Sequence, residues 1–250
     1  MAIINKTKCR PRVWLIALML MMSLTVGSVL SAQPTDTSYA ALRGFAEKVY
    51  GTDDLLVNGR GYSPQHYNAS GNPWFGAKDF TQGSLTAYDK SFGQVPMIYN
   101  VATDELLLRC VPADGNTIFV VLNPRLVQSF DLEDHHFILL PPMQAPDPVG
   151  YVEAVYDGSF HFVIKYTKTF VNNYSPNTPH GSFTRLQATP YIIANKKAIK
   201  VVSQKELLRY FDENRKAIKG YLRQQHIRYK RATSAQLIPL MKTIDQLSQK

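Results

Sequence analysis

Cysteine is scarce in this chain, since only Cys9 and Cys110 occur among 250 residues. So few cysteines exclude a small domain that is held together by disulfides. Charged residues make up 19% and hydrophobic residues 45% of the sequence. This ordinary balance excludes a disordered, collagen-like or low-complexity chain. The fold must therefore be stabilised by a hydrophobic core.

Catalytic and cofactor-binding motifs are also lacking. The sequence contains no G-x-S-x-G elbow, H-E-x-x-H, P-loop, G-x-G-x-x-G, C-x-x-C or EF-hand loop. We therefore assign no catalytic residue, no cofactor and no metal site. The best candidate for a metal or acid–base site is Asp134-His135-His136. Adjacent strand residues point to opposite faces, however, so the two histidines do not easily share one metal. Cys110 lies in an apolar run and is expected to be a buried, inert thiol.

The first 32 residues have the three-part pattern of a secretory signal peptide. Four basic residues between Lys6 and Arg12 precede an apolar run over 13–24, and small residues follow as far as Ala32. The apolar run is shorter than the roughly 20 residues that span a bilayer, which favours cleavage over the alternative, an N-terminal membrane anchor. We expect an exported protein, periplasmic or extracellular, with no transmembrane helix once residues 1–32 are removed.

Basic charge is concentrated at the C-terminal end of the chain. Residues 196–250 hold 14 Lys and Arg against 4 Asp and Glu, whereas residues 33–195 hold 10 against 15. A basic segment of this kind suits weak contact with an anionic surface. Nucleic acid is not expected as a partner, because export separates the chain from it. The expected partner is an unknown envelope protein, a glycan or a small ligand.

The remainder, 33–250, is expected to be a single β-rich domain. Residues 39–50 have the spacing of a short helix, with Leu42, Phe45 and Val49 on one face. From 83 to 202 the hydrophobic period is two and turn residues recur, with Asp157-Gly158 as a strong hairpin signal. Short links join antiparallel neighbours. The fold class is therefore α+β and mainly β, an antiparallel meander that forms a curved sheet, a barrel or a sandwich.

Residues 203–250 are predicted to form two helices that pack on the β region. Ser203 and Glu206 have the spacing of a capping box at the start of the first helix. Its apolar stripe comprises Leu207, Phe211, Ile218 and Leu222. Ser234 is expected to cap the second helix.

A loop over 61–76 combines turn-forming residues with an unusual number of aromatic rings. These candidate ligand-binding residues are Tyr62, His66, Tyr67, Trp74 and Phe75. Aromatic rings are good platforms for sugars and other amphipathic ligands, because they present a rigid apolar face. The simpler interpretation is that the rings anchor the loop on the core. The sequence leaves both interpretations open.

Several short segments have a familiar arrangement. They are Asp54-Leu55-Leu56-Val57-Asn58-Gly59, Gly71-Asn72-Pro73-Trp74-Phe75, Gly83-Ser84-Leu85-Thr86-Ala87-Tyr88, Val95-Pro96-Met97-Ile98-Tyr99-Asn100 and Lys205-Glu206-Leu207-Leu208. With these segments the chain resembles a group of uncharacterised exported, β-rich proteins of Gram-negative bacteria. That resemblance implies no activity and transfers no functional residue.

These observations together favour a non-catalytic envelope or secreted protein that binds a partner or small ligand through its β scaffold. A curved antiparallel sheet offers a concave face for such binding. Two alternatives stay open. One is a hydrolase whose active site is assembled from residues distant in sequence, and the other is a structural docking component of the cell envelope.

Overall fold

The computed structural model describes residues 53–76, 78–112, 115–140 and 150–249. The expected signal segment at 1–32 and the expected helix at 39–50 lie outside these residues. None of the helices in the described part of the chain is long and apolar enough to cross a membrane.

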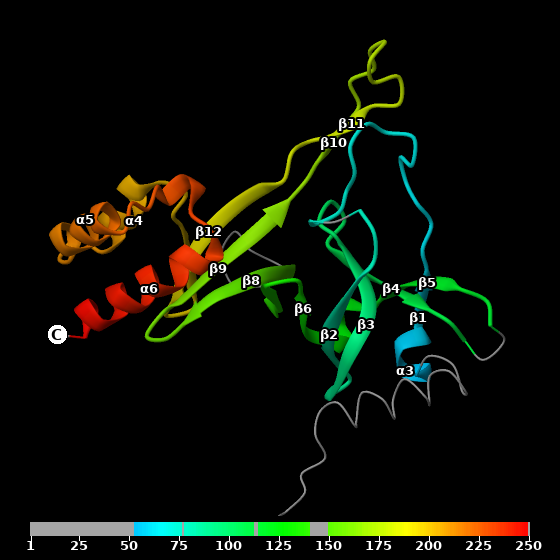
Figure 1. Cartoon of the computed structure of the whole chain (residues 1–250), viewed down its shortest axis with the longest axis horizontal. Helices are drawn as coiled ribbons and strands as arrows, with labels where there is room; N and C mark the ends of the chain where they lie inside the picture. Colours follow the sequence, from blue (N-terminus) through cyan, green and yellow to red (C-terminus); the bar gives the residue numbers. More distant parts are fainter. Residues whose placement is uncertain (1–52, 77, 113–114, 141–149, 250) are drawn as a thin grey trace, which may run out of the picture. The chain divides into compact units, whose positions relative to one another are not determined.

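The described part of the chain folds around one large antiparallel sheet of 11 strands (Figure 1). In sheet order the strands are β1 (Gly59–Gly61), β5 (Ile118–Leu122), β4 (Glu105–Cys110), β3 (Lys90–Asn100), β2 (Thr81–Ala87), β6 (Val127–Leu132), β7 (His135–Leu140), β8 (Gly150–Asp157), β9 (His161–Thr167), β12 (Gln187–Ala194) and β13 (Lys197–Lys200). The predicted mainly β class is confirmed. The sheet is not closed into a barrel, because the end strands β1 and β13 do not pair with each other.

The β structure begins earlier than the expected start at 83 and includes a small second sheet within the expected limits. The four-residue helix α3 (Asp54–Val57) leads directly into β1, which pairs with β5, and β2 begins at Thr81. Strands β10 (Phe170–Val171) and β11 (Ser182–Phe183) form a separate two-stranded sheet. The predicted start at 83 was therefore too late, because the three-residue β1 is too short to show alternation.

Neighbouring strands follow one another along the chain except at three places, where β1 pairs with β5, β2 with β6 and β9 with β12. The chain leaves β5 through the 3-10 turn η2 (Pro124–Leu126) and returns to pair β6 with the free edge of β2. Curvature of the sheet then brings the β3–β4 turn against β8 and β9. Asp104 in that turn lies 2.9 Å from Lys165 of β9, measured between Oδ1 and Nζ, and its Oδ2 accepts from the backbone N–H of Tyr151 at 3.3 Å.

The main core lies on one face of the sheet and is rich in aromatic rings. Tyr99, Phe130, Phe137 and Tyr151 are each at most 1% exposed, and their ring centroids lie 4.8–5.8 Å apart. Edge-to-face and offset contacts of this kind add to the free energy gained by burying the rings. The opposite face carries two smaller apolar clusters. One of them, Ile98, Leu107 and Val121, is covered by Tyr62, Trp74 and Phe80 of the preceding loop.

The C-terminal segment forms three α-helices rather than the two that were predicted. They are α4 (Gln204–Tyr210), α5 (Arg215–Gln224) and α6 (Ser234–Ser248), with a 3-10 turn η3 (Tyr229–Arg231) before α6. The Ser203–Glu206 capping box is confirmed. The first predicted helix is interrupted at Phe211, whose φ of −104° and ψ of 53° are not helical. Thr233, and not Ser234, caps α6, in a second capping box with Gln236.

The helices dock on the β8–β9 end of the sheet, as Figure 1 shows. Leu207, Ile218 and Leu222 are buried in the main core, whereas Phe211 is half-buried against Phe160. Asp245 of α6 accepts hydrogen bonds from Tyr156 and from the backbone and hydroxyl of Ser159. A Cβ on Gly158 would lie 2.3 Å from this carboxylate. The predicted Asp157-Gly158 hairpin thus also serves as the docking point of the last helix.

Candidate ligand-binding cleft

Two long loops meet at one end of the sheet. The first is the aromatic loop that follows β1, and the second runs from Lys168 through β10 and β11. The backbone N–H of Ser70 donates to the carbonyl of Gly181 at 3.0 Å, and Phe183 N–H donates to the carbonyl of Ser70 at 2.8 Å. Gly181 has φ +76°, and a Cβ there would lie 2.5 Å from the Phe170 ring. A glycine is therefore needed where the two loops approach each other.

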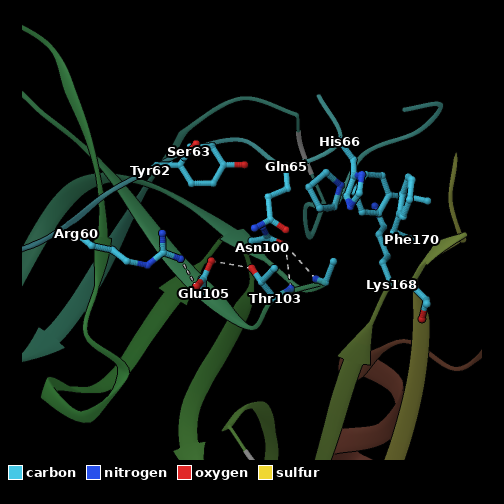
Figure 2. Close-up of a pocket in the computed structure, with 14 residues that line it drawn as sticks. Arg60, Tyr62, Ser63, Gln65, His66, Asn100, Thr103, Glu105, Lys168 and Phe170 are labelled. Atoms are coloured by element: carbon cyan, nitrogen blue, oxygen red, sulfur yellow. Dashed lines mark hydrogen bonds and ion pairs between the residues drawn. The ribbon is translucent and has the colours of Figure 1, made fainter. Parts of the chain in front are cut away.

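A cavity of about 370 Å³ opens between these loops and the β3–β4 turn (Figure 2). Its lining residues are Arg60, Tyr62, Ser63, Gln65, His66, Pro73, Asn100, Ala102, Thr103, Glu105, Lys168, Thr169, Phe170 and Phe183. Sites for small ligands typically occupy about 300–1,000 Å³. The cavity is therefore large enough for a small polar molecule.

The aromatic wall of the cavity is built from both loops. The ring of His66 stacks on Phe170 with centroids 3.6 Å apart and planes 10° from parallel. Phe183 meets Phe170 nearly edge-on at 5.5 Å. His66 adopts φ +56°, a left-handed conformation that few non-glycine residues occupy. Local backbone strain of this kind is often found at functional sites.

The polar wall comes from β1 and the β3–β4 turn. Asn100 is 4% exposed, and its Oδ1 accepts from the backbone N–H groups of Ala102 at 3.0 Å and Thr103 at 3.2 Å, so the turn is fixed. Glu105 accepts from the Arg60 guanidinium and, through its other oxygen, from the Thr103 hydroxyl at 2.8 Å. These interactions hold Arg60, whose side chain is 57% exposed, beside Glu105 in the cavity lining (Figure 2).

Lys168 joins the two loops beneath the aromatic wall. Its ammonium donates to the carbonyl of Asn72 at 3.1 Å, to Asn72 Oδ1 at 3.0 Å and to the carbonyl of Trp74 at 2.7 Å. All three acceptors are neutral. Desolvation lowers the pKa of Lys168 from its ordinary value. Lys168 therefore positions the aromatic loop and adds positive potential to the cavity floor.

The structure separates the five aromatic-loop candidates. Tyr62 and His66 line the cavity. Tyr67 is 78% exposed and lies outside it. Trp74 packs on the small cluster of Ile98, Leu107 and Val121. Phe75 is 5% exposed in the main core, with its ring 4.8–6.4 Å from those of Tyr99, His135, Phe137 and Tyr166.

Sequence reasoning did not identify Arg60, Glu105, Lys168 or Phe170 as cleft residues. Arg60 and Glu105 are 45 residues apart, and Lys168 is 94 residues from Trp74. No local motif contains such pairs. The one available signal was the isolated arginine between Gly59 and Gly61, and by itself that pattern is common.

The other titratable candidates lie away from the cleft. His135 contacts the buried Glu153 at 2.7 Å, and His136 contacts Asp131 at 2.5 Å. The prediction that the two histidines point to opposite faces is confirmed. Burial favours a raised pKa for Glu153, but hydrogen bonds from His135, Ser234 and Tyr166 outweigh it and hold the pKa below its ordinary value. Among the described residues, no group of three or more His, Cys, Asp or Glu has the geometry to hold a metal ion.

Cys110 is buried in β4, and its Sγ lies 3.8 Å from the carbonyl of Leu56. Burial raises the pKa of this thiol to about 11. A thiol with so high a pKa is almost entirely protonated near neutral pH and is a poor nucleophile. The expectation that Cys110 is buried is confirmed, and its raised pKa supports the expectation of low reactivity.

Comparison of the chain with protein-family models, with curated proteins and with solved structures finds no match.

Proposed function

We propose that this protein is an exported, non-catalytic binding protein whose cleft takes a saccharide-like ligand. The observation that carries the proposal is the pairing of an aromatic wall, His66 stacked on Phe170 at 3.6 Å, with a polar wall that is already held in place. A sugar ring has an apolar face and a hydroxyl-bearing rim. Aromatic faces stabilise the first, and the Ser63, Gln65 and Thr103 side chains are suited to bind the second.

The cleft favours binding over hydrolysis. A glycoside hydrolase usually needs two carboxyl groups that flank the bond to be cleaved. Glu105 is the one carboxylate among the described residues that line the cavity. Both of its oxygens are engaged, one by Arg60 and the other by Thr103. A carboxylate held in this way is better suited to orienting Arg60 than to proton transfer.

A glycan-array screen with the purified protein and two variants tests this proposal. Ser63→Trp fills the cavity from an exposed lining position and should abolish the array signals of the wild type. Tyr67→Ala is the control, because it removes an aromatic ring from the same loop but outside the cavity. This variant should keep the array signals of the wild type. An empty array for the wild type, or signals that Ser63→Trp leaves intact, would contradict the proposal.

Export is a separate part of the proposal and has its own measurement. The basic segment and short apolar run at the N-terminus support cleavage near Ala32. Mass spectrometry of the mature protein should find an N-terminus near Gln33. Recovery of a membrane-bound product that still begins at Met1 would favour the anchor instead.

A second function, docking on an anionic surface, is favoured by the charge of α5 and η3. Residues 215–231 contain seven Lys and Arg and no Asp or Glu. Six of the seven are exposed, and within the described residues only Arg215 has a carboxylate partner, Asp212 at 3.6 Å. Ile218 and Leu222 hold α5 on the core, so the cations project from a fixed helix.

Co-sedimentation with lipid vesicles tests this docking. The protein should bind phosphatidylglycerol vesicles and not phosphatidylcholine vesicles, and added salt should release it. Changing Lys216, Lys219 and Arg223 together to Glu should abolish binding, while Lys90→Glu at an exposed site in β3 should not. Equal sedimentation of the triple variant and the wild type would exclude α5 as the docking face.

A further inference from the structure

A second cavity, of about 570 Å³, lies beside the first. It is formed where α3 joins β1, where β5 ends and where η2 begins. Its lining residues are Asn58, Gly59, Arg60, Glu105, Val121, Leu122, Asn123, Pro124 and Leu126. Arg60 and Glu105 line both cavities. The ion pair between them is therefore the shared wall.

Strand register explains why this wall is well ordered. Arg60 of β1 and Leu107 of β4 both pair with Val121 of β5, so β1 and β4 flank β5. Glu105, at the start of β4, is held by the Thr103 hydroxyl at 2.8 Å and receives the Arg60 guanidinium across the end of β5. The guanidinium is fixed by this contact at the junction of the two cavities.

The charge of the junction favours an anionic ligand. Arg60 is 57% exposed, and Glu105 is its one carboxylate partner within the described residues. A guanidinium has five N–H donors, so most of them stay available. Lys168 adds a second positive charge, and its hydrogen bonds go to neutral oxygens. Of the described residues that line the two cavities, Glu105 alone is acidic.

We infer that the binding site continues over Arg60 into the second cavity and takes an acidic oligosaccharide. The carboxylate of one sugar unit binds Arg60, and the neighbouring units occupy the two cavities. At about 370 Å³ the cleft alone is at the small end of the range for ligand sites, whereas with the adjoining 570 Å³ it approaches the upper end, roughly 1,000 Å³. This inference rests on the proposed saccharide-binding function and names its ligand class.

Calorimetric titration with galacturonic acid monomer, trimer and hexamer tests the inference, with the methyl-esterified hexamer as the uncharged control of equal length. Affinity should rise at least about tenfold from monomer to hexamer, because linked units bind with a high effective concentration. Asn58→Trp fills the second cavity from an exposed position and should remove this gain in affinity with chain length. Arg60→Gln should weaken binding of the acid and not of the ester.

The outcomes distinguish this inference from the proposed function. Equal affinity for monomer and hexamer, or a hexamer that binds Asn58→Trp as tightly as the wild type, would show that the second cavity is not part of the site. Equal affinity for acid and ester would overturn the acidic class. One further outcome would overturn this inference and leave the saccharide cleft intact. In that outcome the array shows binding of neutral glycans, Ser63→Trp abolishes it, and no galacturonate binds.

Discussion

The carboxylate of Asp104 lies 2.9 Å from the ammonium of Lys165, although their strands are far apart in the sheet order. The same carboxylate accepts from the Tyr99 hydroxyl at 2.5 Å. Burial and the adjacent Asp104 raise the pKa of Tyr99 well above its ordinary value. The contact holds the β3–β4 turn, which carries one wall of the cleft, against β8 and β9.

Asp104→Ala should therefore destabilise the protein by about 2 kcal/mol, the usual cost of losing a charged hydrogen-bond partner from a partly buried site. Urea denaturation measures the difference. Asp134→Ala, which removes the same group from the exposed β6–β7 turn, is the matched control and should change the free energy of unfolding by less than about 0.5 kcal/mol. Equal effects of the two substitutions would show that the Asp104–Lys165 contact does not stabilise the curved sheet.

Two substitutions in α5 should have opposite effects. Ile218 is fully buried, so Ile218→Ala should cost roughly 2–5 kcal/mol. Gly220 faces open space within the same helix, and Gly220→Ala should stabilise the protein by about 1 kcal/mol because alanine has the higher helix propensity. Chemical denaturation of both variants checks whether α5 is part of the folded core. A negligible loss for Ile218→Ala would mean that the helix is detached.

Asp245 should make stability depend on acid pH. Hydrogen bonds from Ser159 and Tyr156 lower its pKa from 3.8 to about 2. Because the folded-state pKa lies below the unfolded value, the stabilisation is complete above about pH 4 and is lost as the pH falls through about 2. Asp245→Asn should reduce the free energy of unfolding at neutral pH and differ little from wild type near pH 2. A constant difference across that interval would contradict the assigned shift.

The structure makes Trp74 an anchor rather than a recognition residue. Its ring packs on Ile98, Leu107 and Val121, and its carbonyl accepts from Lys168. Trp74→Ala should lower the free energy of unfolding by about 2–4 kcal/mol, somewhat less than for a fully buried tryptophan. Thermal unfolding measures this, with Tyr67→Ala as the exposed control. Unchanged stability together with lost glycan binding would restore Trp74 as a recognition residue.

Local sequence signals predicted much of the fold. The Asp157-Gly158 hairpin, the Ser203–Glu206 capping box and the opposite orientations of His135 and His136 all depend on residues close in sequence, and the structure contains each of them. The break between α4 and α5 was missed because the apolar spacing of Leu207, Phe211, Ile218 and Leu222 continues across it. A turn that keeps the apolar residues on the buried face leaves the hydrophobic periodicity unchanged, so the periodicity alone does not indicate where the helix breaks.

The cleft was beyond prediction for a different reason. The aromatic loop alone suggested Tyr62 and His66, but not the rings and charges that face them. Phe170 stacks on His66 because Ser70 pairs with Gly181 and Phe183, contacts that depend on how the two loops fold over the sheet. Since no single segment holds both sides of the cleft, its composition emerges only in three dimensions.

The most direct test of the account is calorimetric titration of the array-positive glycan into wild type, Phe170→Ala and Tyr174→Ala. Phe170 forms the aromatic wall of the cleft, whereas Tyr174 lies on the same loop, is 62% exposed and does not line the cavity. Phe170→Ala should stay folded and weaken binding at least about tenfold, equivalent to about 1.4 kcal/mol, and Tyr174→Ala should bind like wild type. Phe170→Ala that binds as tightly as wild type would contradict the central claim that this cleft is the ligand site.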